Sequence, residues 1–321
     1  MKGFDQMHPT AFIYSSHNCC EYIHRWWIVE RALQSANNKT LLHLPMSEGG
    51  NGGEWGSPQQ FGWGKFEWYF NFFKKYGLDA YPFYYSDHIT EEEAENLFDL
   101  LANSEVVVLG GGNSSIGLSR YKALGEHFFG DKDLFKKVLH NRASKGKLTA
   151  GFSAGADQLG SILASQIHTD LNDAEGFGLC HDIMSTLHHD PQRRDELAMG
   201  AQKFPHMMVF GLPNDSGIGV SQGVLPSGNI WQLIDFVTDT SWDIPHDEFH
   251  IKTRQGVGIE HVYNDGQRQW HFQGGDKMAR IIAPDSSWQD AYIFGADGSC
   301  HHYWTQEDAN YSSPQQVFEK Y

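Results

Sequence analysis

The chain is poor in cysteine and has no long apolar run. Four of its 321 residues are cysteine, with Cys19 and Cys20 adjacent and Cys180 and Cys300 far apart. Because no CxxC pair is present, the sequence predicts neither a disulfide framework nor a metal site. No apolar run reaches the roughly 18 residues of a membrane span, and the first residues lack the apolar stretch of a signal peptide. We therefore expect a soluble, cytoplasmic protein.

Basic residues are also few. Lysine and arginine together number 24, against 40 aspartates and glutamates, which gives a formal net charge of -16. Such a charge repels nucleic acid and anionic lipid, so neither is expected as a partner. Hydrophobic residues make up 40% of the chain, and its length allows a sizeable core in one large domain, or in one domain with an appendage.

The first two-thirds of the chain alternate short β-rich runs with helix-like stretches. The run TAFIYSS precedes a helical pattern over 21–35, and the strand-like EVVVL run ends in the glycines of GGGN. Thr90, with Glu93 three residues later, forms a capping-box pattern at the start of a helix. The alternation predicts an α/β fold, a mostly parallel sheet with helices on both faces. Ligands bind at the carboxyl ends of such strands.

The pattern changes after about Gly217, where short runs are separated by glycine and polar turns. Asn264-Asp-Gly266 between two alternating runs predicts a β-hairpin, and a terminal helix is expected from about Gln306. We expect a core over residues 1–220 and a β-rich extension with a terminal helix over 221–321, packed on the same domain.

The motif GFSAG places Ser153 between Gly151 and Gly155, after an apolar run and before a helix-like pattern. Two interpretations fit. The glycines can serve a tight strand-to-helix turn on steric grounds alone, or they can form a nucleophile elbow that exposes the serine hydroxyl. At a helix N-terminus, free N–H groups would favour a developing negative charge.

A nucleophilic serine also needs a base and an oxyanion hole. Among 18 histidines, the pair His188-His189 is the best placed, because it ends a β-like run and precedes a helix predicted from Pro191. This position puts the pair at the carboxyl edge of the same sheet as Ser153. The backbone N–H of Ala154 and one from Gly110–Gly112 are candidate oxyanion donors. The GGGN motif lacks the features of a phosphate-binding loop.

Taken together, VVVLGGGNSS, GFSAGA, the histidine-bearing GFGLCHDIMSTLHHD and GLPNDSGIGV resemble the dipeptidase E and cyanophycinase family of serine peptidases, over about residues 106–220. The resemblance implies a flavodoxin-like, glutamine-amidotransferase-like fold. The expected reaction requires no metal or organic cofactor. The resemblance also implies Ser153 as nucleophile, His188 as base, and Gly112 and Ala154 as oxyanion donors. Asn113, the last residue of GGGN, is a candidate for substrate binding.

One position departs from that family, whose members commonly carry a glutamate that orients the histidine. The corresponding residue is Asn214, whose amide oxygen can accept the imidazole N–H but stabilises an imidazolium less than a carboxylate does. Asp170 ranks beside Asn214 as the candidate for this third catalytic role, since some family members have a functional acid there. Asp215 and Asp173 are further alternatives.

The sequence leaves open the roles of three further features, which are two arginines, a phenylalanine stripe and a glycine-rich segment. Arg193 and Arg194 are candidates to bind a substrate carboxylate, or are solvated helix-surface residues. The stripe Phe66, Phe70 and Phe73 favours core packing or a homodimer interface, and the segment Gly49–Gly56 is a candidate flap.

The sequence thus predicts a serine peptidase acting on a small peptide or isopeptide, with an aspartyl or β-aspartyl bond as the leading substrate class. Two alternatives remain. One is an amidotransferase-like amidase, against which the serine at the elbow counts, because the usual nucleophile there is cysteine. The other is a catalytically silent binding or assembly protein, which is compatible with Asn214 in place of the family's acid.

Overall fold

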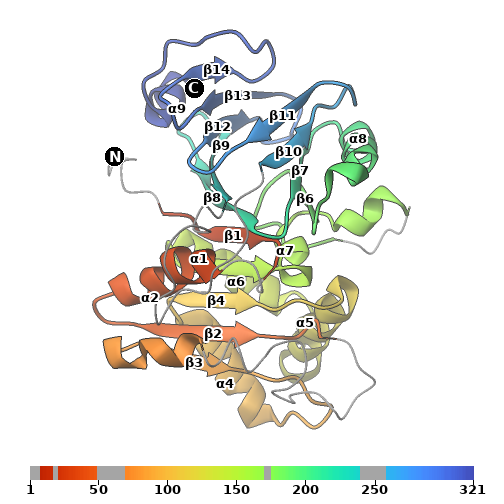
Figure 1. Cartoon of the computed structure of the whole chain (residues 1–321). Helices are drawn as coiled ribbons and strands as arrows, with labels where there is room; N and C mark the ends of the chain where they lie inside the picture. The colour runs from red at the N-terminus through yellow and green to blue at the C-terminus, as the bar shows by residue number, and fades with distance from the viewer. Residues whose placement is uncertain (1–7, 17–20, 49–68, 170–174, 239–257) are drawn as a thin grey trace.

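The computed structural model describes residues 8–16, 21–48, 69–169, 175–238 and 258–321. A sheet of ten strands runs through the molecule, in the order β14-β13-β12-β9-β8-β1-β5-β4-β2-β3 (Figure 1). Its parallel half consists of β1 (Ala11–Tyr14), β5 (Leu148–Phe152), β4 (Val106–Leu109), β2 (Thr40–Leu44) and β3 (Asp79–Pro82). Its antiparallel half consists of β8 (Ser216–Val224), β9 (Ile230–Thr238), β12 (Lys277–Ile282), β13 (Gln289–Phe294) and β14 (Cys300–His302).

Helices cover both faces of the parallel half, as the alternation predicted. Strand β4 is buried along its whole length, because a strand between two helical layers needs apolar side chains on both sides. Leu42 and Leu44 belong to one core cluster and Leu41 to the other. One face carries α4 (Glu91–Asn103), α5 (Ser114–Phe129), α6 (Leu134–Ser144) and α7 (Ala154–Leu159). The other carries α1 (Glu21–Ile23), the π-helix η3 (His24–Val29), α2 (Glu30–Gln34) and the 3₁₀ helix η4 (Phe72–Tyr76).

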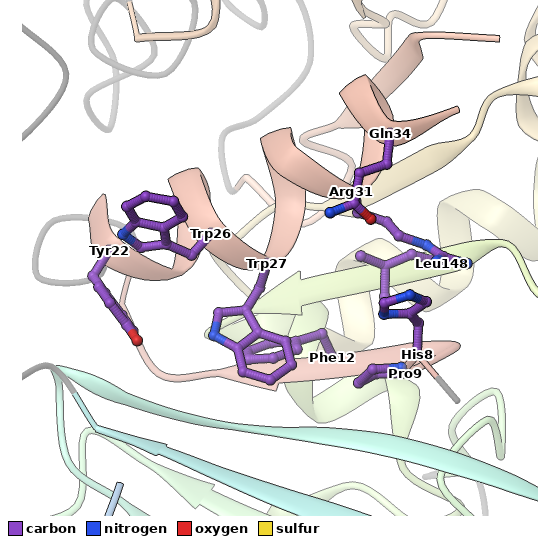
Figure 2. A pocket seen from close by; sticks show the side chains of 9 residues that line it. All are labelled: His8, Pro9, Phe12, Tyr22, Trp26, Trp27, Arg31, Gln34 and Leu148. Carbon is purple, nitrogen blue, oxygen red and sulfur yellow. The ribbon is translucent and has the colours of Figure 1, made fainter. Parts of the chain in front are cut away.

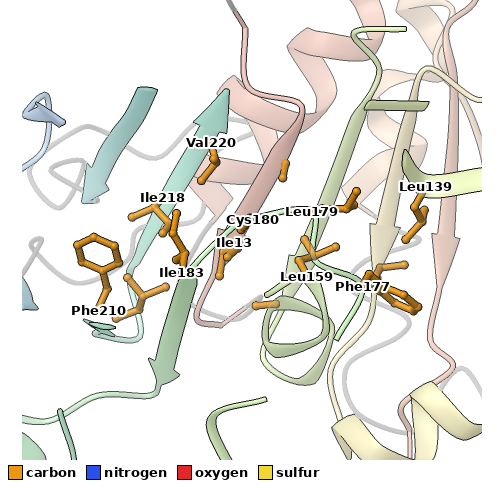
Figure 3. Packing of buried hydrophobic residues seen from close by; sticks show 14 of the residues in the cluster. Ile13, Leu139, Leu159, Phe177, Leu179, Cys180, Ile183, Phe210, Ile218 and Val220 are labelled. Carbon is orange, nitrogen blue, oxygen red and sulfur yellow. The ribbon is translucent and has the colours of Figure 1, made fainter. Parts of the chain in front are cut away.

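A second sheet of four strands packs beside α7, in the order β11-β10-β7-β6. Its strands are β6 (Ile183–Leu187), β7 (Met208–Leu212), β10 (Ile259–Val262) and β11 (Gln269–Phe272). Phe210 and Phe272 from this sheet join the same core cluster as Ile218 and Phe236 of the large sheet. The rings of Phe236 and Phe272 stack with centroids 3.7 Å apart. Figure 3 shows part of this cluster, which fixes the small sheet on the large one.

The remaining helices close the outer surfaces. The 3₁₀ helix η6 (Pro191–Arg193) and α8 (Arg194–Lys203) follow β6, and α8 covers the outer face of the small sheet. Another 3₁₀ helix, η5 (Ala164–Ile167), contributes to the same cluster. Helix α9 (Pro314–Lys320) packs on β12 and β13. Among the described residues, no helix is both long and apolar enough to cross a membrane.

Several local predictions are confirmed. Thr90 and Glu93 form a reciprocal capping box at the start of α4, and Asn264–Gly266 connects β10 and β11 in an antiparallel hairpin. The terminal helix begins at Pro314 rather than near Gln306.

Position 220, where the sequence suggested a boundary, lies inside β8, so both proposed regions share one sheet. Phe70 and Phe73 are buried in the core, whereas Phe66 lies outside the described residues.

Candidate active site

Ser153 stands on a tight turn between β5, which ends at Phe152, and α7, which begins at Ala154. Its backbone angles, φ 50° and ψ −119°, are rare for a residue with a side chain. A methyl group on Gly151 would lie 2.4 Å from the carbonyl oxygen of Gly155, and one on Gly155 would lie 2.3 Å from that of Leu109. The turn therefore requires small residues on steric grounds, and it is also strained at the serine.

The serine hydroxyl begins a chain of two hydrogen bonds. Ser153 Oγ lies 3.1 Å from Nε2 of His188, and Nδ1 of His188 lies 2.6 Å from Oδ1 of Asn214. An amide oxygen can only accept, so Nδ1 carries the proton and Nε2 is left to accept the serine proton. His188 is exposed and Ser153 half-buried. The arrangement has the order and atom roles of a nucleophile, a base and an orienting group.

The three residues come from two sheets. Ser153 follows β5 of the large sheet, whereas His188 follows β6 and Asn214 comes two residues after β7 of the small sheet. Leu187 and Leu212 are paired in the parallel β6–β7 ladder, so the histidine and the asparagine leave neighbouring strands at the same edge. The expectation that His188 lies at the edge of the same sheet as Ser153 is therefore wrong. Packing between the sheets brings the two edges together.

The glycines of the GGGN loop approach the serine closely. A methyl group on Gly111 would lie 3.3 Å from Cβ of Ser153. Gly112 has φ 127°, and a methyl group there would lie 2.0 Å from Ser47 O, so no larger residue fits. The N–H of Ala154, at the start of α7, has no acceptor within its helix. The oxyanion roles of Gly112 and Ala154 remain predictions on this geometry.

Asn113 and the two arginines already have partners within the chain. The Asn113 side chain caps α5 by accepting from the Ile116 N–H at 3.0 Å. Arg193 pairs with Glu196 at 2.6 Å, and Arg194 pairs with Glu260 at 2.6 Å. Their roles in substrate binding stay predictions.

Glu260 also distinguishes the two adjacent histidines. The His189 side chain is fully buried, and its Nε2 lies 2.7 Å from Oε2 of Glu260. Burial would raise the pKa of Glu260, but hydrogen bonds from Arg194 and His189 outweigh it and lower that pKa. His189 thus belongs to a hydrogen-bonded cluster with Glu260 and Arg194, while His188 faces Ser153. Sequence reasoning missed Glu260, because it lies 71 positions from His189 on a strand without a motif.

Of the candidates for the orienting role, the structure brings Asn214 to His188. Asp170, Asp173 and the segment Gly49–Gly56 lie outside the described residues. Asp215 is buried next to Asn214 in the chain, one residue before β8 begins at Ser216.

A second network fixes α7 to the GGGN loop. Asp157 accepts from the Ser114 hydroxyl and from the Ala164 N–H, both at 2.7 Å. The Gln158 amide donates to Ser47 Oγ and to Ser114 O, both at 2.8 Å. These bonds hold the two segments that carry the candidate oxyanion donors in a fixed relation. Burial raises the pKa of Asp157 to about 6, against the opposing hydrogen bonds from Ala164 and Ser114.

The raised pKa of Asp157 predicts a dependence of stability on pH. The folded chain binds this proton more tightly than the unfolded chain, so stability falls as the pH rises from about 4 to about 6. Above that range the ionised carboxylate costs about 3 kcal/mol. Asp157→Asn should therefore be more stable than the native chain at pH 8 by up to that amount, with little difference at pH 4. Urea unfolding at both pH values measures this, and an equal shift at both would contradict the assignment.

A cavity of about 320 Å³ lies elsewhere, beside His8, Phe12, Trp26, Trp27 and Arg31 (Figure 2). It also contacts Leu148, the first residue of β5, whereas Ser153 follows the last. The cavity therefore sits at the opposite end of that strand from the serine and takes no part in the candidate site. Within the described ranges, no group of three histidine, cysteine or acidic side chains is placed to hold a metal ion.

Comparison with known proteins gives a fold but no family. No protein-family model and no curated protein matches the sequence. The chain is similar to a solved structure of a peptidase from an acI-B1 Actinobacterium, with a TM-score of 0.52 and 12% sequence identity. The match covers 86% of this chain and 99% of that one. At this identity the likeness shows a shared fold, and the α/β architecture expected from the sequence is thereby confirmed.

Proposed function

We propose that this chain is a serine hydrolase that cleaves a peptide or isopeptide bond in a small substrate. The observation that carries the proposal is the hydrogen-bond chain from Ser153 through His188 to Asn214, placed at a strained strand-to-helix turn. Strained backbone of this kind exposes the serine hydroxyl beside the sheet. That the similar solved structure is a peptidase adds support to this choice of reaction.

The proposed reaction has two stages. As Ser153 Oγ attacks the scissile carbonyl carbon, Nε2 of His188 takes the hydroxyl proton and Asn214 keeps the Nδ1 proton in place. The carbonyl oxygen becomes negative and is stabilised by the N–H groups of Ala154 and Gly112. The His188 proton then passes to the leaving amine, the C–N bond breaks and an acyl-enzyme remains. Water, deprotonated by His188, hydrolyses the ester and restores the serine.

The leading substrate class is an aspartyl or β-aspartyl peptide, on the strength of the family resemblance. A panel of α- and β-aspartyl dipeptides, with β-aspartyl-arginine included, tests this choice. Hydrolysis of only one of the two linkages would define the substrate. If no dipeptide is hydrolysed but Ser153 still reacts with a fluorophosphonate, the aspartyl substrate class is rejected and the serine hydrolase is not.

A silent binding protein on the same fold is the second candidate, and Asn214 in place of an acid is the observation that favours it. A fluorophosphonate reagent separates the two. A working site forms one covalent adduct per chain, and peptide mass spectrometry should locate it at Ser153. Absence of stoichiometric labelling at that residue would reject the serine hydrolase.

Replacement of Asn214 should show how far the lack of a negative charge at this position lowers kcat. Asn214→Asp preserves the size of the side chain and adds a carboxylate 2.6 Å from His188 Nδ1. Because that charge stabilises the imidazolium in the transition state, we expect kcat to rise by at least about tenfold, whereas Asn214→Ala should lower it. Asn214→Glu, with the residue of the resembled family, tests whether one more methylene is tolerated. Equal kcat in Asn214→Asp, Asn214→Ala and the native chain would remove Asn214 from the mechanism.

A further inference from the structure

Strand β1 of the large sheet ends beside the turn that carries His188. Ser15, the first residue after β1, is fully buried. Its Oγ accepts a hydrogen bond of 2.7 Å from the backbone N–H of His188, and its own N–H donates to Ser216 O at 3.0 Å. The β6–β7 ladder ends at Leu187. The N–H of His189 still donates to Leu212 O of the small sheet at 2.9 Å, whereas the N–H of His188 finds its acceptor at the end of β1 in the large sheet.

Ser15 is also a neighbour of the nucleophile. Strands β1 and β5 pair in parallel with Tyr14 opposite Phe152, and the Ser153 N–H donates to Tyr14 O at 3.2 Å. Ser15 and Ser153 are therefore each one residue beyond the same pair. The hydrogen bond that the His188 N–H donates to Ser15 thus ties the backbone of His188 to the strand next to the nucleophile.

The backbone of His188 needs such support because its φ is 52°, in the left-handed region. For a residue with a side chain this conformation is unfavourable and persists only where the surroundings fix it. Arg193 supplies contacts on the other side, donating to the carbonyl oxygens of Leu187 at 3.2 Å and of His188 at 3.3 Å. Glu196 holds the same guanidinium at 2.6 Å.

We propose that Ser15 and Arg193 are positioning residues for His188, an inference that rests on the proposed function. Ser15 fixes the N–H of the histidine and Arg193 fixes its carbonyl, so together they hold the turn that aims Nε2 at Ser153. Their contacts are with the backbone of the base and leave its imidazole to the reaction. Displacement of a reacting group by about 1 Å can lower a rate by about a hundredfold.

The test uses a neutral alkyl fluorophosphonate, which reacts at the serine without needing the natural substrate. Labelling at several reagent concentrations gives the maximal rate kinact and the binding constant KI. Ser15→Ala and Arg193→Ala should each lower kinact by about tenfold or more, with KI unchanged. If Arg193 instead binds a substrate carboxylate, its variant will keep the native kinact with this neutral reagent, and the inference fails for that residue.

Matched controls exclude a general loss of structure. Ser221 is a buried serine on β8, 3% exposed, and Ser221→Ala should keep the native kinact. Arg268 resembles Arg193 closely: its side chain is 44% exposed against 45%, each pairs with a carboxylate three residues away at 2.6 Å, and Arg268 donates to the Trp304 carbonyl. Arg268→Ala should also leave kinact unchanged. Should Ser15→Ala fail to fold, Arg193→Ala, at a half-exposed site, carries the test.

Double variants separate positioning from simple destabilisation. If Ser15 and Arg193 act through His188, then neither substitution should lower the residual labelling rate of His188→Ala any further. Additive losses would overturn the inference. Failure of this inference is distinct from failure of the proposed function. The positioning role alone is rejected if Ser153→Ala and His188→Ala lose labelling while Ser15→Ala and Arg193→Ala label at the native rate. The proposed function is rejected if Ser153→Ala is still labelled.

Discussion

Ser153→Ala should lower kcat by at least about a thousandfold, the scale of loss when a nucleophile is removed from a catalytic triad. The reason is chemical, because alanine has no hydroxyl to attack a carbonyl or to react with a fluorophosphonate. The fold should not change, since alanine keeps the Cβ atom and hence the same backbone strain at φ 50°. Hydrolysis of the dipeptide panel and covalent labelling, measured on the same preparation, give the result.

The native chain and Ser221→Ala serve as controls for Ser153→Ala, and urea unfolding confirms matched stability. Retention of most hydrolytic activity in Ser153→Ala would contradict the elbow assignment. Loss of labelling with retention of hydrolysis would place the nucleophile elsewhere.

His188→Ala should cause a loss of similar size, about a thousandfold, whereas His189→Ala should leave most of the activity. The difference follows from their contacts: Nε2 of His188 lies 3.1 Å from Ser153 Oγ, while Nε2 of His189 lies 2.7 Å from a Glu260 oxygen. Loss of the buried His189 ring should instead lower the free energy of unfolding by about 2–4 kcal/mol, through the cavity and the lost partner of Glu260.

Each variant of the pair is therefore the control for the other, with kcat and urea unfolding measured on both. A larger loss of kcat in His189→Ala would move the base to that residue. Modest and equal losses in both would remove the pair from the mechanism.

The parts of the site predicted from sequence are those that depend on local geometry. The glycines around Ser153 were recognisable because a tight strand-to-helix turn excludes side chains at both positions, as the contacts of Gly151 and Gly155 show. The capping box at Thr90 and the hairpin at Asn264–Gly266 are likewise set by residues close in the chain. The family resemblance supplied Asn214, which does contact His188.

The parts that were missed depend on contacts between distant segments. No periodicity in the chain indicates that β6 and β7 leave the main sheet, because a buried strand has the same apolar pattern in either sheet. The hydrogen bond between Ser15 and His188 joins residues 173 positions apart. Neither Ser15 nor Glu260 belongs to a recognisable sequence motif. Packing of Phe210 and Phe272 on the large sheet brings the two sheets together and so allows the Ser15 contact, whereas the Glu260 contact is made within the small sheet.

The strained backbone of Ser153 bears on why a serine is there at all. Glycine would adopt φ 50° and ψ −119° without the roughly 1–3 kcal/mol that such a conformation costs other residues. The local backbone conformation thus costs Ser153 more than it would cost a glycine, and the hydroxyl of Ser153 is hydrogen-bonded to His188 at 3.1 Å. Selection for stability alone would favour glycine at this position. A protein that only bound or assembled would gain by losing this side chain, so the strained serine favours the proposed hydrolase over the silent binding protein.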